Sequence, residues 1–259
     1  MTVDLAVLEQ GTDQGIPPLV ILHGLFGSGR NWQSIARALA ATRRVLAFDL
    51  RNHGASPWAP TMSYPEMAED VWAALAARGI SEAALLGHSM GGKIAMVMAL
   101  DRPQFVERLA VVDIAPTAHA PIHRPLIEAM RNLDLTDNPR RSEAEARLEA
   151  TVPEAGVRQF LVQNLVTEDG GLRWRINLQA IEASLTELSG FPASYAEKRY
   201  EGPTLIVAGG RSTYIKRADK PVFSRFFPNL RLVEIPDAGH WVHAEQPRAF
   251  LDAVGPFLG

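Results

Sequence analysis

Cysteine is absent from all 259 residues of the sequence. Disulfides, thiolate metal sites and cysteine nucleophiles are therefore excluded, so any covalent catalysis must use another side chain. The sequence also lacks an apolar run near the roughly 18 residues needed to cross a bilayer. Its first ten residues, MTVDLAVLEQ, do not combine a basic start with a long apolar stretch, as a secretory signal does. We therefore expect a cytoplasmic protein without stable membrane insertion.

Neither sign of charge dominates the sequence. The 26 Lys and Arg residues against 29 Asp and Glu residues give a formal net charge of −3 at pH 7. Such a chain has no electrostatic reason to bind nucleic acid or an anionic membrane, and we expect neither partner. The sequence leaves the oligomeric state open. With 47% hydrophobic and 21% charged residues, the composition is that of an ordinary globular protein.

Short apolar runs alternate with longer amphipathic stretches along most of the chain. The runs predict strands at 18–23, 44–49, 82–87, 108–113, 204–208 and 230–235. Helical spacing of apolar residues predicts helices at 31–41, 64–78, 89–100 and 216–227, and a last helix from 244. Strands separated by helices of this length are typical of βαβ units. The sequence thus predicts an α/β fold with a mostly parallel central sheet flanked by helices.

This alternation stops between residues 116 and 199, which we call the insertion. The insertion is helix-rich, shows no convincing strand and is interrupted by Pro116, Pro121, Pro125, Pro139, Pro153 and Pro192. An excursion of this length from a sheet of βα units is an inserted subdomain rather than a loop. We predict a core of residues 1–115 and 200–259, with the insertion as a helical cap after the strand that ends at Asp113.

The apolar residues of the insertion have two possible uses. Some can line an acyl channel, and most must pack the insertion on the core, as amphipathic helices do. The candidates for either use are Leu126, Ile127, Met130, Phe160, Leu161, Leu165, Trp174 and Ile176.

Residues 87–91, Gly-His-Ser-Met-Gly, fit the pattern G-x-S-x-G. This pattern places a serine on a tight strand-to-helix turn, with its hydroxyl exposed above the strand ends. The pattern alone is weak, but here an apolar segment, AALLG, precedes the serine and a helix-forming run, KIAMVMAL, follows it. We therefore predict Ser89 as a nucleophile, with the N-terminal amides of the next helix facing developing negative charge.

A serine hydroxyl is a poor nucleophile without a neighbouring base, so a downstream histidine is needed. His240 is the best candidate, because it follows the last predicted strand and its loop opens on the same sheet edge as Ser89. His243 is the weaker alternative, at the expected start of a helix. His88 lies inside the turn itself, and we expect it to pack or hydrogen-bond rather than catalyse.

Tetrahedral intermediates of acyl transfer need two backbone donors aimed at the forming oxyanion. The amide of Met90, directly after the nucleophile, is the first candidate. The second is expected in the loop His-Gly-Leu-Phe-Gly that follows the first core strand. Leu25 is favoured because Gly24 before it allows the necessary backbone conformation, and Phe26 is the alternative. His23 is expected to brace this loop.

Three motifs now stand in order: HGLFGS at 23–28, GHSMGGK at 87–93 and GHWVHAEQP at 239–247. In this order they resemble the α/β-hydrolase superfamily over nearly the whole chain. DLRNHGAS at 49–56 and AGGRSTYI at 208–215 are further similar to the small YbfF-like bacterial esterases and their mitochondrial relatives. The resemblance implies hydrolysis of an acyl ester or thioester, a small-molecule substrate, without a cofactor.

Two other groups of polar residues are expected to be structural. Asp49 and Arg51 are predicted to form a polar brace beneath the loops of the site. His119 and His123 have the i,i+4 spacing of a metal-binding helix face, but Pro121 between them argues against that face. We therefore predict no metal site.

A carboxylate must orient the base and stabilise its protonated form. Resemblance to the superfamily implies an Asp shortly after the strand TLIVA, but Ser212 stands there. Asp113 ends an earlier strand whose loop opens on the same edge, and YbfF-like enzymes resemble this arrangement. We favour Asp113, and Asp219 remains the rival, reachable if the loop after Ser212 folds back.

These residues predict a serine hydrolase that cleaves carboxylic esters, with acyl-CoA thioesters as a further substrate class, through a Ser-His-Asp triad and an acyl-enzyme. The same triad also supports cofactor-free haloperoxidase or carbon–carbon bond hydrolase activity. A ligand-binding receptor with this fold is the alternative outside enzymes. An intact nucleophile, base and oxyanion loop argue against a receptor, because binding alone does not require all three.

Overall fold

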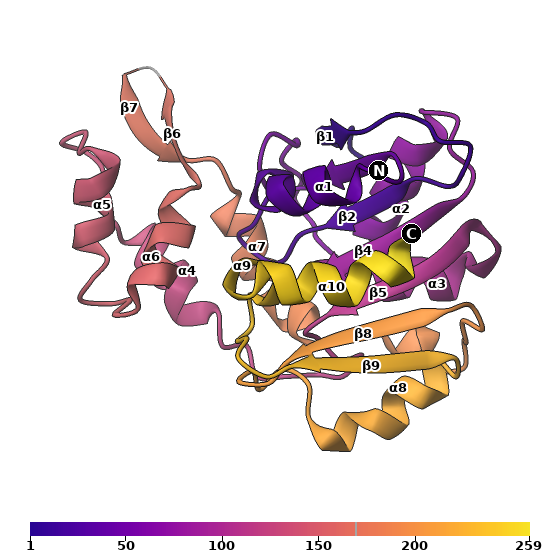
Figure 1. Cartoon of the computed structure of the whole chain (residues 1–259). Coiled ribbons are helices and arrows are strands. Elements are labelled where there is room, and N and C mark those ends of the chain that lie inside the picture. Colours follow the sequence, from indigo (N-terminus) through magenta and orange to yellow (C-terminus); the bar gives the residue numbers. More distant parts are fainter. Residues whose placement is uncertain (169) are drawn as a thin grey trace.

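The computed structural model of the protein describes residues 1–168 and 170–259. Within them, one sheet has the strand order β1-β3-β2-β4-β5-β8-β9 (Figure 1). Its strands are β1 (Val7–Gln10), β2 (Leu19–Leu22), β3 (Val45–Phe48), β4 (Ala83–His88), β5 (Val106–Val112), β8 (Thr204–Gly209) and β9 (Leu230–Ile235). β1 pairs antiparallel with β3, and all other neighbours pair in parallel. The predicted α/β class with a mostly parallel sheet is confirmed.

Helices cover both faces of this sheet. They are α1 (Gln33–Leu39) and α10 (Pro247–Leu258) on one face, and α2 (Tyr64–Ala76), α3 (Met90–Asp101) and α8 (Lys220–Phe226) on the other. Strand β2 shows the division, because Val20 and Leu22 belong to one apolar cluster while Leu19 and Ile21 belong to the other. A strand buried on both faces reads as a continuous apolar run, which is why the central strands are visible in the sequence.

The structure differs from the prediction at several element ends. β1 was not predicted, since its sequence VLEQ is short, partly exposed and at the sheet edge. The last helix is split into α9 (Val242–Glu245) and α10, because Pro247 has no N–H to continue the first and favours the start of the second. Short 3-10 helices lie in the core at Gly29–Trp32, Pro103–Phe105 and Arg217–Asp219, and another lies in the insertion at Ala193–Tyr195.

The insertion lies between β5 and β8. It contains α4 (Arg124–Arg131), α5 (Arg141–Arg147), α6 (Ala155–Val162), β6 (Leu165–Glu168), β7 (Gly171–Trp174) and α7 (Leu178–Ser189). In Figure 1, α4, α5, α6 and the two strands project to the left of the sheet. The prediction that the insertion has no strand is wrong, because β6 and β7 form an antiparallel hairpin. Each strand has only four residues, too few for an alternating pattern to stand out in the sequence.

Lys93 of α3 joins the two ends of the insertion. Its ammonium donates to the carbonyl of Thr117, where the chain leaves the core, at 2.9 Å. It also donates to the carbonyl of Gly190, where the chain returns, at 2.5 Å. The side chain is fully buried, and burial lowers the pKa of Lys93 to about 7. One side chain of the helix that follows Ser89 therefore holds the insertion at both Thr117 and Gly190.

Across the described residues, no helix is both long enough and apolar enough to cross a membrane.

Candidate active site

Five loops meet at the carboxyl edge of the parallel strands. Leu25 follows β2, Ser89 follows β4 and Asp113 follows β5. Ser212 follows β8, and His240 follows β9. Ligands of open α/β sheets bind outside the carboxyl ends of the strands, because loops from distant parts of the sequence converge there. This edge is therefore the candidate active site.

Ser89 sits on a strained turn between β4 and α3. Its backbone has φ 53° and ψ −119°, a conformation that residues other than glycine rarely adopt. The two motif glycines make the turn possible: a Cβ on Gly87 would lie 2.2 Å from the Gly91 oxygen, and one on Gly91 would lie 2.2 Å from the Leu22 oxygen. The close approach of α3 to β2 and β4 therefore requires glycine at both positions and leaves the Ser89 side chain at the strand end.

Three side chains form a hydrogen-bonded chain across this edge. The Ser89 hydroxyl lies 3.0 Å from Nε2 of His240. Nδ1 of the same imidazole lies 2.7 Å from Oδ2 of Asp113. The structure thus brings together the predicted nucleophile, base and acid, each within hydrogen-bonding distance of the next.

The carboxylate of Asp113 is fully buried and held from several sides. Its Oδ1 accepts a hydrogen bond from the Gly209 amide at 3.0 Å. Its Oδ2, which faces His240, also accepts a hydrogen bond from the Ser212 hydroxyl. Ser212 occupies the place where the superfamily resemblance implied the acid, and here it contacts the carboxylate that lies one strand away.

Asp219, the rival acid, lies elsewhere. Its Oδ2 accepts a hydrogen bond from the Lys216 amide at 2.7 Å, and its Oδ1 lies 3.4 Å from the Thr117 hydroxyl. Since Nδ1 of His240 is already bonded to Asp113, the geometry favours Asp113 over Asp219.

The two predicted oxyanion donors border one small space beside the nucleophile. Leu25, Ser89 and Met90 share in lining a cavity of about 20 Å³. Met90 is the first residue of α3, where a helix leaves the amide N–H without a partner in the helix. Phe26, the alternative to Leu25, donates its amide to Nε2 of His53 at 3.2 Å. Its N–H is therefore committed, and Leu25 is the better candidate.

Four further histidines surround the site, and burial lowers the pKa of each. The pKa falls to about 4 for His23 and to about 3 for His53 and His243, and it lies well below its usual value for His88. His88 contacts the backbone carbonyl of His240 through Nε2 at 2.9 Å, which fits the predicted hydrogen-bonding role. His243 stacks on Trp32 with ring centroids 3.8 Å apart. These neutral rings are part of the packing beneath the site.

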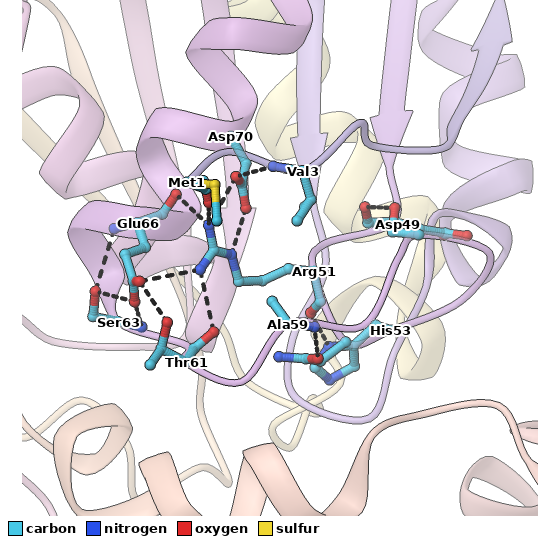
Figure 2. A network of polar contacts seen from close by, with 12 residues as sticks. Met1, Val3, Asp49, Arg51, His53, Ala59, Thr61, Ser63, Glu66 and Asp70 are labelled. Atoms are coloured by element: carbon cyan, nitrogen blue, oxygen red, sulfur yellow. Dashed lines mark hydrogen bonds and ion pairs between the residues drawn. The ribbon is translucent and has the colours of Figure 1, made fainter.

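Asp49 and Arg51, in the segment after β3, are held by polar contacts. Arg51 makes a two-pronged ion pair with the buried Asp70, with N–O distances of 2.6 and 2.8 Å (Figure 2). Asp49 accepts hydrogen bonds from the amides of Gly29 and Ala55, both at 2.7 Å. Asp49 thus ties this segment to Gly29, directly after the loop at 23–28, whereas Arg51 ties it to α2. A brace beneath the loops of the site stays a prediction for Arg51.

A cavity of about 240 Å³ opens beside Ser89 and His240 between the core and the insertion. Its apolar lining comes from the core residues Leu25, Phe26, Trp32 and Trp241 and from the insertion residues Ile122, Leu126, Val157, Phe160 and Leu161. Of the apolar residues considered in the sequence, Leu126, Phe160 and Leu161 line this cavity. Ile127, Met130, Leu165 and Ile176 are buried in the packing instead.

Sequence reasoning missed two aromatic residues of the site. Tyr214 stacks on His240, and His123 contacts Tyr214 and lines the same cavity. The only signal was position, since Tyr214 lies two residues after Ser212 in a loop expected at the catalytic edge.

Comparison with known proteins agrees with this architecture. The family model described as alpha/beta hydrolase fold matches residues 17–247. The chain therefore belongs to the α/β-hydrolase family, as its motifs predicted. The mouse sn-1-specific diacylglycerol lipase ABHD11 is 42% identical over 95% of this chain and 82% of its own length. The Escherichia coli esterase YbfF is 36% identical over 93% of this chain and 92% of its own length.

Among solved structures, a marine microorganism esterase superposes with a TM-score of 0.95 and 37% identity, covering 99% of this chain and 100% of its own. Esterases and lipases thus recur among both the sequence relatives and the structural neighbours. This chain is accordingly an enzyme of the carboxylic ester hydrolase class.

Proposed function

We propose that the enzyme cleaves its ester by acyl transfer to Ser89, with His240 as general base and Asp113 as the triad acid. The hydrogen-bonded chain from the Ser89 hydroxyl through His240 to Asp113 carries this proposal. A hydroxyl in contact with an imidazole loses its proton to that imidazole as it attacks, and the buried carboxylate stabilises the imidazolium that results.

The reaction has two half-steps. Ser89 attacks the acyl carbonyl, His240 takes the hydroxyl proton, and the amides of Leu25 and Met90 receive the oxyanion. His240 then returns the proton to the leaving alcohol as the carbon–oxygen bond breaks. A water molecule deprotonated by His240 attacks the acyl-enzyme, and the proton passes back to Ser89 as the free acid leaves.

The substrate is a small-molecule ester whose apolar part occupies the 240 Å³ cavity. The apolar lining supports this choice, because it offers dispersion contacts to an acyl group and few polar partners. Five of the lining apolar residues belong to residues 116–199, so the insertion acts as the cap that selects the acyl group. A thioester carbonyl meets the same nucleophile and the same two amides, and acyl-CoA thioesters belong to the proposed range.

Labelling with a fluorophosphonate tests the nucleophile. The folded protein is expected to gain one adduct by intact mass, the Ser89→Ala variant none, and the exposed-site control Ser81→Ala one. A folded protein that is not labelled would contradict the proposal. Turnover of p-nitrophenyl esters and acyl-CoAs of graded chain length then separates ester from thioester preference.

A further inference from the structure

Tyr214 lies flat against the imidazole of His240. The two ring centroids are 3.8 Å apart, and the ring planes differ by 16°. Tyr214 comes from the loop after β8, the loop whose Ser212 contacts Asp113. The triad itself does not require an aromatic ring at this position, so the contact needs its own explanation.

The face of an aromatic ring attracts a cation, because its π electrons make the face negative. His240 becomes a cation each time it accepts the Ser89 proton. Burial, followed by the nearby Asp113 charge, raises the pKa of the Tyr214 phenol to about 12. The phenol therefore stays neutral in the working pH range, and its face is available to the imidazolium.

The Tyr214 hydroxyl reaches into the insertion. It lies 3.3 Å from Nε2 of His123, which immediately precedes α4. Burial lowers the pKa of His123 to about 4, so this ring is neutral and its Nε2 can accept a hydrogen bond from the Tyr214 hydroxyl. His123 also meets Phe26 edge to face, with ring centroids 6.0 Å apart. His123 of the insertion thus contacts both Tyr214, which stacks on His240, and Phe26 in the loop at 23–28.

We propose that Tyr214 is a positioning residue that holds the His240 ring in reach of both Ser89 and Asp113 and stabilises its protonated form, and that His123 couples this support to the insertion. The inference rests on the proposed role of His240 as base. An acyl group that orders the insertion around the cavity would also fix His123, and through it the Tyr214 ring. The His240 ring is then better positioned for proton transfer when an acyl group is bound than when the site is empty.

Other titratable groups also face His240, and their titration must be distinguished from that of His240 in a pH–rate profile. They are Asp113 after β5, His88 of β4, His243 of α9, and His119 and His123 of the insertion. Burial lowers the pKa of each of these four histidines. They are neutral near pH 7, so we attribute the first loss of activity as the pH falls below 7, the acid limb of the pH–rate profile, to protonation of the base.

The test compares Tyr214→Leu, which loses the stacked ring, with Tyr214→Phe, which keeps it. Tyr214→Leu should lower kcat about tenfold and move the acid limb of kcat/KM about half a pH unit to lower pH, since the cation loses its π partner. Tyr214→Phe should keep the limb in place and mainly raise KM. His123→Phe should raise KM similarly, and adding it to Tyr214→Phe should change nothing further because the same contact is already lost.

A second measurement covers the case in which Tyr214→Leu does not fold. Phenylalanines with one, two or three ring fluorines at position 214 keep the shape of the ring while weakening its negative face. The acid limb should move to lower pH with each fluorine. A limb that stays fixed across the series, or a folded Tyr214→Leu with unchanged limb and kcat, would overturn the inference. Absence of Ser89 labelling in the unmodified enzyme would instead refute the proposed function.

Discussion

Acid should unfold this enzyme at a pH where most carboxylates are still charged. His23, His53 and His243 are buried and neutral, with the pKa lowered by burial to about 4, 3 and 3. In the unfolded chain each has a pKa near 6.5. Below pH 6.5 the unfolded chain therefore binds protons that the folded protein does not. The free energy of unfolding then decreases as the pH is lowered, until the pKa values of the folded protein are reached.

The expected loss is large. At pH 5 each of these histidines destabilises the folded protein by about 2 kcal/mol relative to pH 7. Together they remove about 6 kcal/mol, which is comparable to the net stability of about 5–15 kcal/mol of an ordinary domain. Carboxylates contribute little in this window, because they titrate below about pH 4.5.

Urea unfolding at pH 7, 6 and 5, followed by tryptophan fluorescence, measures this loss. His243→Phe is the informative variant: its ring can still stack on Trp32, and Nδ1 of His243 has no hydrogen-bond partner among the described residues. The difference in unfolding free energy between pH 7 and pH 5 should shrink by about 2 kcal/mol in this variant. Val254→Ala, which changes the same buried apolar cluster as Trp32, should lower stability equally at both pH values. An unchanged pH dependence in His243→Phe would refute the reasoning.

Three further outcomes follow from the contacts around the site. Asp113→Asn should lower kcat by about 10³- to 10⁴-fold in a protein that still folds, whereas Asp219→Asn should leave it near normal; the reverse result in a steady-state assay would show that the acid was misassigned. Ser212→Ala removes one donor from the Asp113 carboxylate, so kcat should fall about tenfold with KM little changed; a normal kcat would show that the Gly209 amide suffices. Lys93→Met should destabilise the protein by about 2–3 kcal/mol by thermal unfolding and expose residues 116–199 to limited proteolysis, because two half-buried carbonyls lose their donor. The half-exposed control Lys198→Met should do neither.

The parts of this molecule that the sequence predicts are those in which one local rule dominates. The central strands are visible because burial on both faces makes them continuously apolar. Ser89 is visible because its turn requires two glycines at fixed spacing. Asp113 and His240 are inferred from topology, since both follow strands that end at the same edge, together with the resemblance to YbfF-like enzymes.

The parts that were missed depend on partners distant in the sequence. The stacking of Tyr214 on His240 joins the loops after β8 and β9, and the contact with His123 adds a residue from the insertion. No periodicity encodes such contacts. The β6–β7 hairpin and β1 were missed for a different reason, since four-residue strands carry too little pattern.

The position of Asp113 has a consequence for engineering. The proposed triad acid stands only four residues before Thr117, whose carbonyl accepts a hydrogen bond from Lys93. A chimera that exchanges the whole segment between β5 and β8 would therefore replace the proposed acid together with the insertion. Exchanging only the chain between Thr117 and Gly190 keeps the acid and both lysine contacts. We expect chimeras with these junctions to retain acyl transfer while taking on the chain-length preference of the donor.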